Sequence, residues 1–359
     1  MTDTQVLATA QQLGTRALSW LHTCYRNGWG RLSDNTIIDL AEPNDVYKPL
    51  CEAAMASALV LRDGVAGPQD ARAARDMLEG AWDQLRQGDM LYERQLRHVT
   101  VTDPLETYAH FARVGYRHAA LEELLESLSR LRAVHAVEIQ GSRQLAVANA
   151  RRVIGLSHRP DWAELAARTW LGALPEPWTI AWSIAYQVTH TVFHLTDWGA
   201  RPGDLPEPMR DYLHAWLPVW LDIWMEIGQW DLVGELLIVD ACIGDPTLGS
   251  SGWEALASVQ RADGLVPRDA EPIEEDEESA IRAHEHTAVV AVVAATVTLS
   301  RALGGTAPAN GAPTGTASGA PNGAASGTAS GAANGTASGA ANGTASGAAN
   351  GTASGAANG

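Results

Sequence analysis

Apolar residues recur at intervals of three and four positions along most of the chain, and this spacing is typical of amphipathic helices. The pattern is clearest in residues 6–28, 46–64, 70–88 and 162–174. Alternating apolar and polar runs, which mark half-buried strands, are nearly absent. Glycine and proline divide the pattern into about a dozen segments of roughly 10 to 25 residues. The sequence therefore predicts an all-α fold.

Many of the predicted helices form pairs joined by short turns, as in a closed α/α toroid or an open α-solenoid. No repeat in the range of about 30 to 47 residues is visible, which favours the toroid. Residues 179–195 and 287–299 are apolar on every side and must be buried on every side. An inner ring of helices covered by an outer ring meets this requirement.

The residues after about position 303 have a different composition. From Gly327 the octamer GTASGAAN is repeated four times, and the chain ends at Gly359. The octamer has no charged and no bulky apolar side chain, so it cannot bury enough surface to offset the entropy of ordering. We therefore predict a helical domain over residues 1–303 and a disordered tail over residues 304–359.

The charge balance and the cysteines limit the partners and the location. The chain has 42 Asp and Glu against 25 Lys and Arg, a net charge of -17, which argues against nucleic acid and anionic membranes. Cys24, Cys51 and Cys242 are too few and too scattered for a disulfide framework. The longest apolar stretch, residues 287–299, is too short to span a bilayer, and no signal peptide is recognisable. We expect a cytoplasmic protein without membrane insertion.

Five aromatic or titratable residues of one predicted helix follow one another at steps of three or four: Trp182, Tyr186, His190, His194 and Asp197. This spacing places them on one helix face. Two imidazoles and a carboxylate on one face can bind a divalent ion. We predict that His190, His194 and Asp197 are metal ligands and catalytic residues. Alternatively, the histidines bond carbonyl groups in the core, or Asp197 only orients His194.

Two further blocks offer ligands. Asp240 and Cys242 form an Asp-x-Cys pair at a predicted helix end, where both side chains could bind zinc. The alternative is a buried thiol beside a capping or solvated acid. His286 begins the most apolar helix and is predicted to point into a central cavity. The predicted metal site therefore adds Asp240, Cys242 and His286, with zinc as the expected ion and iron as the alternative.

Residues 253–269, WEALASVQRADGLVPRD, resemble the Gln-x-x-Asp-Gly segment of the terpene cyclase and protein prenyltransferase superfamily. In that superfamily an outer helix of an α/α toroid ends in this turn before an inner helix begins. In protein prenyltransferase β subunits an Asp-x-Cys pair and a later His hold zinc, and Asp240, Cys242 and His286 are similar and follow in the same order. The resemblance covers about a tenth of the chain. It implies a toroid, a zinc site and a prenyl-like substrate.

The sequence departs from that superfamily in three ways. The spacing from Cys242 to His286 is shorter, Asp240 lies at the end of its helix, and the Asp-x-Asp-Asp motif of class II cyclases is absent. If all inner helices run the same way, Asp197 and Cys242 lie at one rim and His286 at the other. The six predicted ligands cannot then share one ion. Residues 189–199, THTVFHLTDWG, resemble uncharacterised helical proteins of actinomycetes, which implies no activity.

Tryptophan supplies the last indication of function. Trp216, Trp220 and Trp224 follow at steps of four, and indole faces in a cavity can bind cationic groups, although such a stripe is more often helix packing. We predict that Trp182, Tyr186 and Trp220 line a substrate cavity. The expected function is an α/α-toroid enzyme with a metal-assisted or histidine-dependent site in a central cavity, for example a metal-dependent cyclase or transferase, that acts on an apolar or prenyl-like small molecule of specialised metabolism. The alternatives are a non-catalytic helical scaffold and a small-molecule binding protein.

Overall fold

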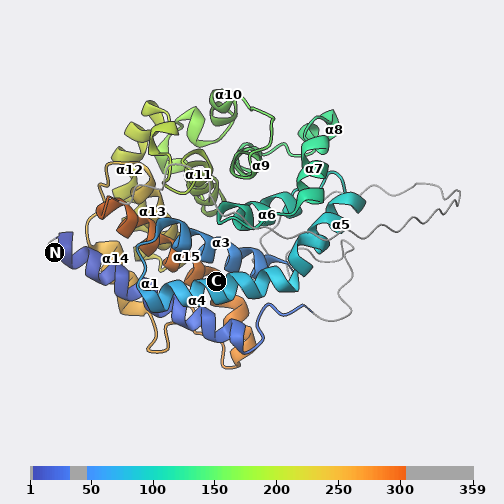
Figure 1. The fold of residues 1–359 in the computed structure, drawn as a ribbon. Coiled ribbons are helices and arrows are strands. Elements are labelled where there is room, and N and C mark those ends of the chain that lie inside the picture. Colours follow the sequence, from blue (N-terminus) through green and yellow to red (C-terminus); the bar gives the residue numbers. More distant parts are fainter. Residues whose placement is uncertain (1–2, 33–46, 305–359) are drawn as a thin grey trace, which may run out of the picture. The chain divides into compact units, whose positions relative to one another are not determined.

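Residues 3–32 and 47–304, which the computed structural model describes, fold into helices joined by turns and loops, with no strand among them. This confirms the predicted all-α class. The predicted tail over residues 304–359 lies, apart from Gly304, outside the described residues. Figure 1 shows the helices in chain order, from α1 in blue to α15 in orange.

The described α-helices have the following bounds: α1 (Asp3–Arg26), α3 (Lys48–Asp63), α4 (Pro68–Gln84), α5 (Asp89–Arg97), α6 (Asp103–Arg113), α7 (Ala119–Leu128), α8 (Arg132–Ala136), α9 (Gly141–Ile154), α10 (Trp162–Ala167), α11 (Trp182–Leu195), α12 (Glu207–Glu226), α13 (Trp230–Cys242), α14 (Ser251–Val259) and α15 (Glu277–Ala302). Short 3-10 helices lie between some of them: η1 (Arg86–Gly88), η2 (Leu171–Ala173), η3 (Pro177–Thr179) and η4 (Pro202–Asp204).

Local sequence signals explain where several helices begin and end. Helix α3 ends at Gly64, whose φ of 66° needs no strain in glycine and whose N–H donates to the carbonyl of Val60 at 3.2 Å. Helix α15 begins after Asp276, whose carboxylate accepts a hydrogen bond from the N–H of Ser279 at 2.8 Å. Helix α4 begins with Pro68, which suits a first helical position because no N–H partner is needed there.

Six helices make a closed series of contacts. Each of α3, α6, α9, α11, α13 and α15 packs against the next, and α15 packs against α3. We call these the inner helices. Helices α1, α4, α10, α12 and α14 pack against them from outside, so we call them outer helices. A closed series is a requirement of the predicted toroid, whereas an open solenoid leaves its first and last repeats apart.

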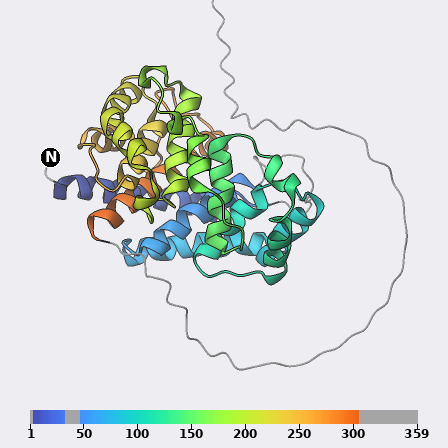
Figure 2. The same cartoon turned by 90° about the horizontal axis from the view of Figure 1, so that it is seen from above.

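The figures show two parts of this series. In Figure 1, α15 lies between α1 and α3, which both contact it. Figure 2 shows α9 and α11, drawn in two shades of green, side by side in the view from above. Each inner helix is thus packed between two neighbours of the series.

The core is densest along α13 and α15. Every residue from Asp231 to Cys242 is buried, and so is every residue from Thr287 to Val297. Burying one Val or Leu side chain stabilises the fold by about 1.5–3 kcal/mol, so these helices contribute much of the favourable free energy. The predicted burial of residues 287–299 is confirmed for all but the last two residues, whereas the predicted burial of residues 179–195 on every side is wrong, because residues 181–183 are exposed. The burial of α13 also encloses acidic side chains.

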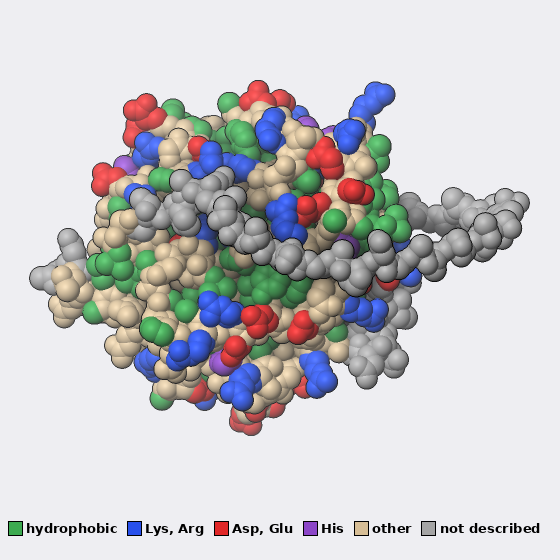
Figure 3. Space-filling view, in the orientation of Figure 1, with side chains coloured by type: hydrophobic (Ala, Val, Ile, Leu, Met, Phe, Trp, Pro, Cys, Tyr) green, Lys and Arg blue, Asp and Glu red, His purple; other side chains and the backbone are tan. Residues whose placement is uncertain are grey.

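The surface is mixed in character. On the face drawn in Figure 3, acidic, basic and hydrophobic side chains are intermixed, and neither charge dominates the uncovered surface. Among the described helices, none combines the length and the apolarity that a membrane span requires.

Candidate functional site

The N-terminal halves of the inner helices meet at one end of the series. The hydroxyl of Tyr186, on the second turn of α11, donates to Oδ2 of Asp231, the second residue of α13, at 2.6 Å. His286 of α15 and Glu52 of α3 are joined by a contact of 2.7 Å between Nδ1 and Oε1. The N-terminal halves of α3, α11, α13 and α15 therefore lie close together.

The C-terminal ends of the inner helices meet at the opposite end. Arg113, the last residue of α6, donates two hydrogen bonds of 2.9 and 2.8 Å to the carboxylate of Asp197, just beyond α11. Arg62, near the end of α3, donates to the carbonyl of Asp197 at 2.9 Å. Arg301, at the end of α15, donates to the carbonyl of Gly244 beyond α13 at 2.6 Å. Arg152, near the end of α9, donates to the carbonyl of His194 near the end of α11 at 3.1 Å. The inner helices therefore all run in the same direction.

Four titratable residues gather at the first of these ends, and we call them the carboxylate–histidine cluster: Glu52, Asp231, Glu235 and His286. One ligand atom each of Asp231, Glu235 and His286 lies within 4.8 Å of the other two. The Nε2 atom of His286 is 3.8 Å from Oδ2 of Asp231 and 4.0 Å from Oε1 of Glu235. The side chains of Asp231 and Glu235 are only 3% and 2% exposed, whereas that of His286 keeps 35% of its surface accessible.

Each potential ligand is held by a neighbouring side chain. The imidazole of His286 contacts Glu52 through Nδ1, which leaves Nε2 turned toward the other two carboxylates. The carboxylate of Asp231 accepts from Tyr186, and that of Glu235 accepts a short hydrogen bond from the hydroxyl of Thr189. Such bonds fix the orientation of a metal-binding side chain and, for histidine, its tautomer.

The charges of the cluster act on one another. Burial alone lowers the pKa of His286, but the carboxylates of Glu52 and Asp231 outweigh burial and raise it to about 10. Burial likewise raises the pKa of Glu52, and the positive charges of His286 and Lys48 outweigh it, so the pKa is lowered. For Asp231 burial prevails and the pKa is raised. The cluster thus holds more carboxylates than its own cations compensate.

Two cluster oxygens have no hydrogen-bond partner among the described residues. They are Oδ1 of Asp231 and Oε2 of Glu52, and both are buried. A buried polar atom without a partner costs about 1–3 kcal/mol, so such atoms are rare. The nearby Thr287 hydroxyl acts on Asp231 and opposes the rise of its pKa, so Oε2 of Glu52 is the more isolated of the two oxygens.

Comparison with protein families gives one match. Residues 14–296 match the model of a domain of unknown function (DUF6895). The chain belongs to this family. All four residues of the carboxylate–histidine cluster lie within the matched range. Comparison with curated proteins finds no match, and comparison with solved structures finds none either.

The α11 histidines of this DUF6895 domain lie beside the cluster, not at its centre. The Nε2 atom of His190 is 3.5 Å from Oε1 of Glu235, and 43% of the His190 side chain is exposed. The ring of His194 follows one turn later, with its centroid 6.1 Å from that of His190. Burial, together with His190 and Arg143, holds the pKa of His194 well below its usual value, so this imidazole is neutral. The accessible surface of His190 and His286 shows that solvent reaches the cluster.

The predicted position of Asp197 on the same helix face is wrong. Helix α11 ends at Leu195, and Asp197 has a φ of +50°, so its side chain leaves the helical register. Its carboxylate is paired with Arg113 and also accepts from Asn149 at 3.1 Å. Burial raises the pKa of Asp197, but Arg113 outweighs burial and lowers it below its usual range. In the structure the carboxylate of Asp197 is thus an ion-pair partner of Arg113 at the end of α6.

Asp240 and Cys242 lie at the C-terminal end of α13, away from His286, as the parallel direction of the inner helices requires. Asp240 Oδ1 accepts from the N–H groups of Thr247 and Leu248 at 2.7 and 3.1 Å, and burial raises its pKa to about 6. Burial raises the pKa of Cys242 to about 12, so it is a thiol. The six predicted ligands are not brought together: only His286 belongs to the described group of three potential ligands.

The predicted cavity residues have different environments. Trp182 is 43% exposed, and its ring centroid is 5.0 Å from that of Tyr186, which contacts the cluster. Trp220 is 1% exposed on outer helix α12 and donates through Nε1 to the carbonyl of Pro177 at 3.2 Å. Trp182 and Tyr186 therefore lie beside the site, whereas Trp220 packs in the core.

Sequence reasoning missed three carboxylates of the cluster. Asp231 and Glu235 are four residues apart in WDLVGELLIVDAC, an otherwise apolar helix, so one face of a buried helix had to carry two acids. That pattern was a usable signal, because buried carboxylates require a partner. Glu52 comes from a helix about 180 residues earlier, and no local pattern connects it to the others.

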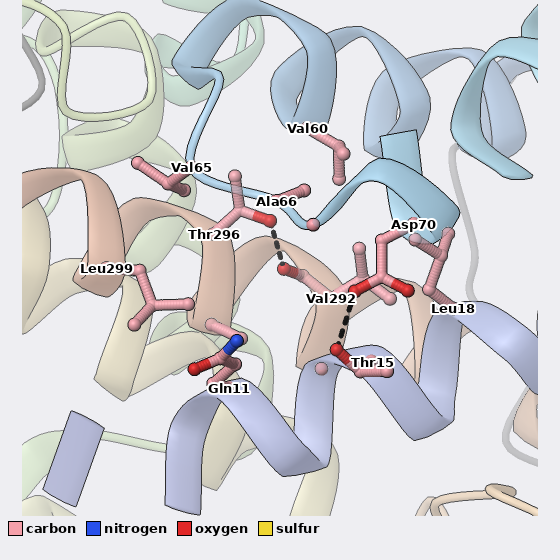
Figure 4. Close-up of a pocket in the computed structure, with 13 residues that line it drawn as sticks. Gln11, Thr15, Leu18, Val60, Val65, Ala66, Asp70, Val292, Thr296 and Leu299 are labelled. Carbon is pink, nitrogen blue, oxygen red and sulfur yellow. Dashed lines mark hydrogen bonds between the residues drawn. The ribbon is translucent and has the colours of Figure 1, made fainter. Parts of the chain in front are cut away.

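A small hollow elsewhere lacks comparable chemistry. It lies between α1, α15 and the connection from α3 to α4, on the side of α15 that faces α1 (Figure 4). Thr15 donates to Oδ2 of Asp70 at 2.6 Å within it. Asp70 is the one titratable residue among the residues that line this hollow, and most of the others are apolar.

Proposed function

We propose that this chain is an α/α-toroid enzyme that binds a divalent metal ion through Asp231, Glu235 and His286 and acts on a small, largely apolar molecule. The observation that carries the proposal is the convergence of these three ligand atoms within 4.8 Å, each held by a further side chain. The closed series of inner helices supports the toroid.

The spacing of the ligand atoms fits an ion. Bonds of about 2.0–2.2 Å at tetrahedral angles separate ligand atoms by roughly 3.4 Å. The distances of 3.8 and 4.0 Å from Nε2 of His286 to the two carboxylates exceed this value only slightly. They are also too long for hydrogen bonds, so a small movement of side chains would close the site on an ion.

The ligand set suits zinc first and iron second. One imidazole and two carboxylates are ligands found in catalytic zinc sites, which keep a further position open for water or substrate. Iron(II) accepts the same nitrogen and oxygen ligands. A divalent ion would also compensate the excess negative charge of the cluster.

The bound ion would supply Lewis-acid chemistry or lower the pKa of a bound water. Glu52 would hold Nδ1 of His286, and Tyr186 and Thr189 would hold the two ligating carboxylates. The apolar part of the substrate would lie along the α11 stripe at Trp182 and Tyr186. A cyclase or transferase reaction is consistent with this arrangement.

The cytoplasm is the location that we propose with this activity. Cys24, Cys51 and Cys242 are all free thiols, and unpaired thiols are typical of a reducing compartment.

A small-molecule binding protein without chemistry is the second candidate. It is favoured by the raised pKa of His286, because an imidazolium can itself act as the counter-ion of Glu52 and Asp231. In that case the cluster is a buried ion-pair network and needs no metal.

X-ray absorption of the zinc-loaded chain separates the two candidates. The metal site predicts nitrogen and oxygen ligands at about 2.0–2.2 Å and no sulfur at about 2.3 Å, since Cys242 is remote. Metabolite profiling then tests for an enzyme: a compound consumed by the zinc-loaded chain and not by Asp231→Asn supports catalysis. If the chain binds no metal and releases its bound metabolite chemically unchanged, it is a binding protein without catalytic activity.

A further inference from the structure

We propose that the exposed face of helix α12 binds a basic, amphipathic helix of another protein. The surface consists of Val219, Ile223 and Ile227, which we call the α12 stripe, and Trp178 lies at its edge. The proposal does not depend on the proposed function, because α12 is an outer helix and contributes no residue to the carboxylate–histidine cluster.

Three large aliphatic side chains are exposed in one row along α12. Val219, Ile223 and Ile227 are 45%, 41% and 53% exposed, and they follow one another at steps of four. Ile227 directly follows the last residue of the helix and keeps a helical backbone conformation. Residues at this spacing form a ridge that packs into the groove of a second helix. Single exposed apolar residues are common, whereas a contiguous row of them is typical of an interaction site.

The chain itself covers the first half of this face of α12 and stops near the middle of the helix. Tyr212 donates to the carbonyl of Pro175 at 2.7 Å, and Trp220 donates to the carbonyl just before Trp178 at 3.2 Å. Ile223 follows Tyr212 by about three helical turns, so the two residues lie on the same face. Trp178, where the covering segment ends, is 77% exposed. A partner helix would continue this cover over the second half of α12.

The charges along the α12 stripe are negative. Asp222 and Glu226 are exposed and alternate with the stripe residues in the sequence. From position 211 to its end, α12 contains no arginine and no lysine. Residues 268–271, which pack against the turn after α12, include the exposed Glu271 and one arginine, which is paired with Asp269 at 2.8 Å. Basic side chains of a partner would therefore meet carboxylates beside the apolar row.

These charges decide between the possible occupants of the surface. Two copies of this chain that packed through the α12 stripe would bring the carboxylates of Asp222 and Glu226 together, and like charges in an interface are unfavourable. The same carboxylates repel an anionic membrane surface. A helix with apolar residues at steps of four, flanked by lysine or arginine, matches both the ridge and its charge.

The test measures the binding of a fluorescently labelled synthetic helix to the full-length chain by anisotropy. The probe carries leucine along one face and lysine along its flanks, and a twin peptide carries glutamate in place of lysine. The wild-type chain should bind the lysine peptide at least tenfold more tightly than the glutamate peptide. Ile223→Gln with Ile227→Gln should weaken binding of the lysine peptide at least tenfold, because the apolar row is lost while the charge is unchanged.

Val99→Gln with Leu96→Gln is the matched control. These two residues are 41% and 53% exposed, as Ile223 and Ile227 are, and they lie at the end of α5, which packs against α6 and α7. Binding of the lysine peptide should be unchanged in this variant. Equal losses in the two double variants would show nonspecific hydrophobic binding and would overturn the proposal.

Reversal of charge tests the electrostatic part. Asp222→Lys with Glu226→Lys should bind the glutamate peptide more tightly than the lysine peptide. Glu79→Lys with Glu123→Lys, which reverses two exposed charges on α4 and α7, should keep the preference of the wild-type chain. A preference for the lysine peptide that survives in the α12 variant would overturn the proposal.

Two further results would assign the surface to another occupant and so overturn the proposal. One is a wild-type dimer in sedimentation equilibrium that Ile223→Gln with Ile227→Gln dissociates. The other is binding to phosphatidylcholine vesicles without binding to the lysine peptide. None of these measurements requires zinc, so their outcome is independent of the proposed metal site.

Discussion

A buried carboxylate is stable only where neighbouring groups replace its lost hydration, and this chain meets that need in two ways. Asp197 has a full partner in Arg113, which donates two hydrogen bonds to it. Asp231 and Glu235 have hydroxyl donors and the shared imidazole of His286, and Glu235 also has the imidazole of His190 at 3.5 Å. The first arrangement is complete, whereas the second is the one for which we propose a bound ion.

Asp240 provides a test of burial at the residue scale. Its pKa is about 6 in the folded chain against 3.8 as the ordinary value, so folding opposes its ionisation. The wild-type chain therefore loses stability as the pH rises from about 4 to about 6. Asp240→Asn keeps the acceptor for Thr247 and Leu248 and should be more stable by about 2–3 kcal/mol at pH 8, with little difference at pH 4. Urea unfolding at both pH values measures this.

Asp245→Asn is the control for that prediction, because Asp245 is exposed five residues further on. It should change stability little at either pH. A loss of metal from Asp240→Asn would contradict the structural role and would return Asp240 to the ligand set.

At the scale of elements, the Gln-x-x-Asp-Gly segment ties the end of α14 to α1. The side chain of Gln260 donates to the carbonyls of Leu13 and Gly264 at 3.1 and 3.0 Å. Gly264 has a φ of +106°, and a Cβ atom there would lie 2.2 Å from the carbonyl oxygen of Arg16. The close approach of two backbones requires glycine at this position.

Gly264→Ala should therefore destabilise the fold by several kcal/mol, about 3 or more, because backbone strain and a backbone clash add. The free energy of unfolding in urea measures the effect. Gly249→Ala is the control, since nothing lies within 4 Å of a Cβ atom at Gly249. Similar free energies of unfolding for the two variants would show that the backbone around Gly264 adjusts to an added Cβ atom at little cost.

The ion pair between α6 and the turn after α11 is a second element-scale test. Arg113→Met leaves the buried carboxylate of Asp197 without its main partner and should cost about 3–5 kcal/mol in unfolding free energy. Arg113→Met with Asp197→Asn should recover much of this loss. Arg117→Met, which removes a surface pair with Glu122, should cost less than about 1 kcal/mol. A small effect of Arg113→Met would show that solvent reaches Asp197.

The helices could be predicted from the sequence, whereas the set of residues that meet at the site could not. Apolar spacing of three and four residues identified the helices, and the apolar run at residues 287–299 identified a buried one. The same spacing extended one helix through Asp197, because it cannot register a backbone that turns to positive φ after Leu195. The link between Glu52 and His286 depends on how distant helices pack, which no local pattern contains.

At the scale of the whole molecule, the common direction of the inner helices decides which residues can act together. It gathers Glu52, Asp231 and His286 at one end, and Asp197 and Cys242 at the other. The sequence resemblance paired Cys242 with His286 across these ends. The common direction of the inner helices therefore explains why the proposed metal site contains different residues from the site predicted from the sequence.

Removal of the octamer repeat is a second whole-molecule test. Residues 305–359 lie outside the described residues, and their composition lacks the bulky apolar side chains that packing requires. We predict that deleting them changes the melting temperature by less than about 2 °C, as measured by circular dichroism. A loss of several degrees would show that the tail contributes to the stability of the helical domain.

The most direct test of the central claim is the zinc stoichiometry of four variants after equilibrium dialysis. Asp231→Asn, Glu235→Gln and His286→Ala should each lose the ion that the wild-type chain binds at one per chain. His194→Ala should keep it, because His194 lies one turn beyond the cluster. Circular dichroism of each variant establishes that it remains folded. Retention of zinc by the three cluster variants, together with its loss from His194→Ala, would place the site on the α11 histidines and contradict the account.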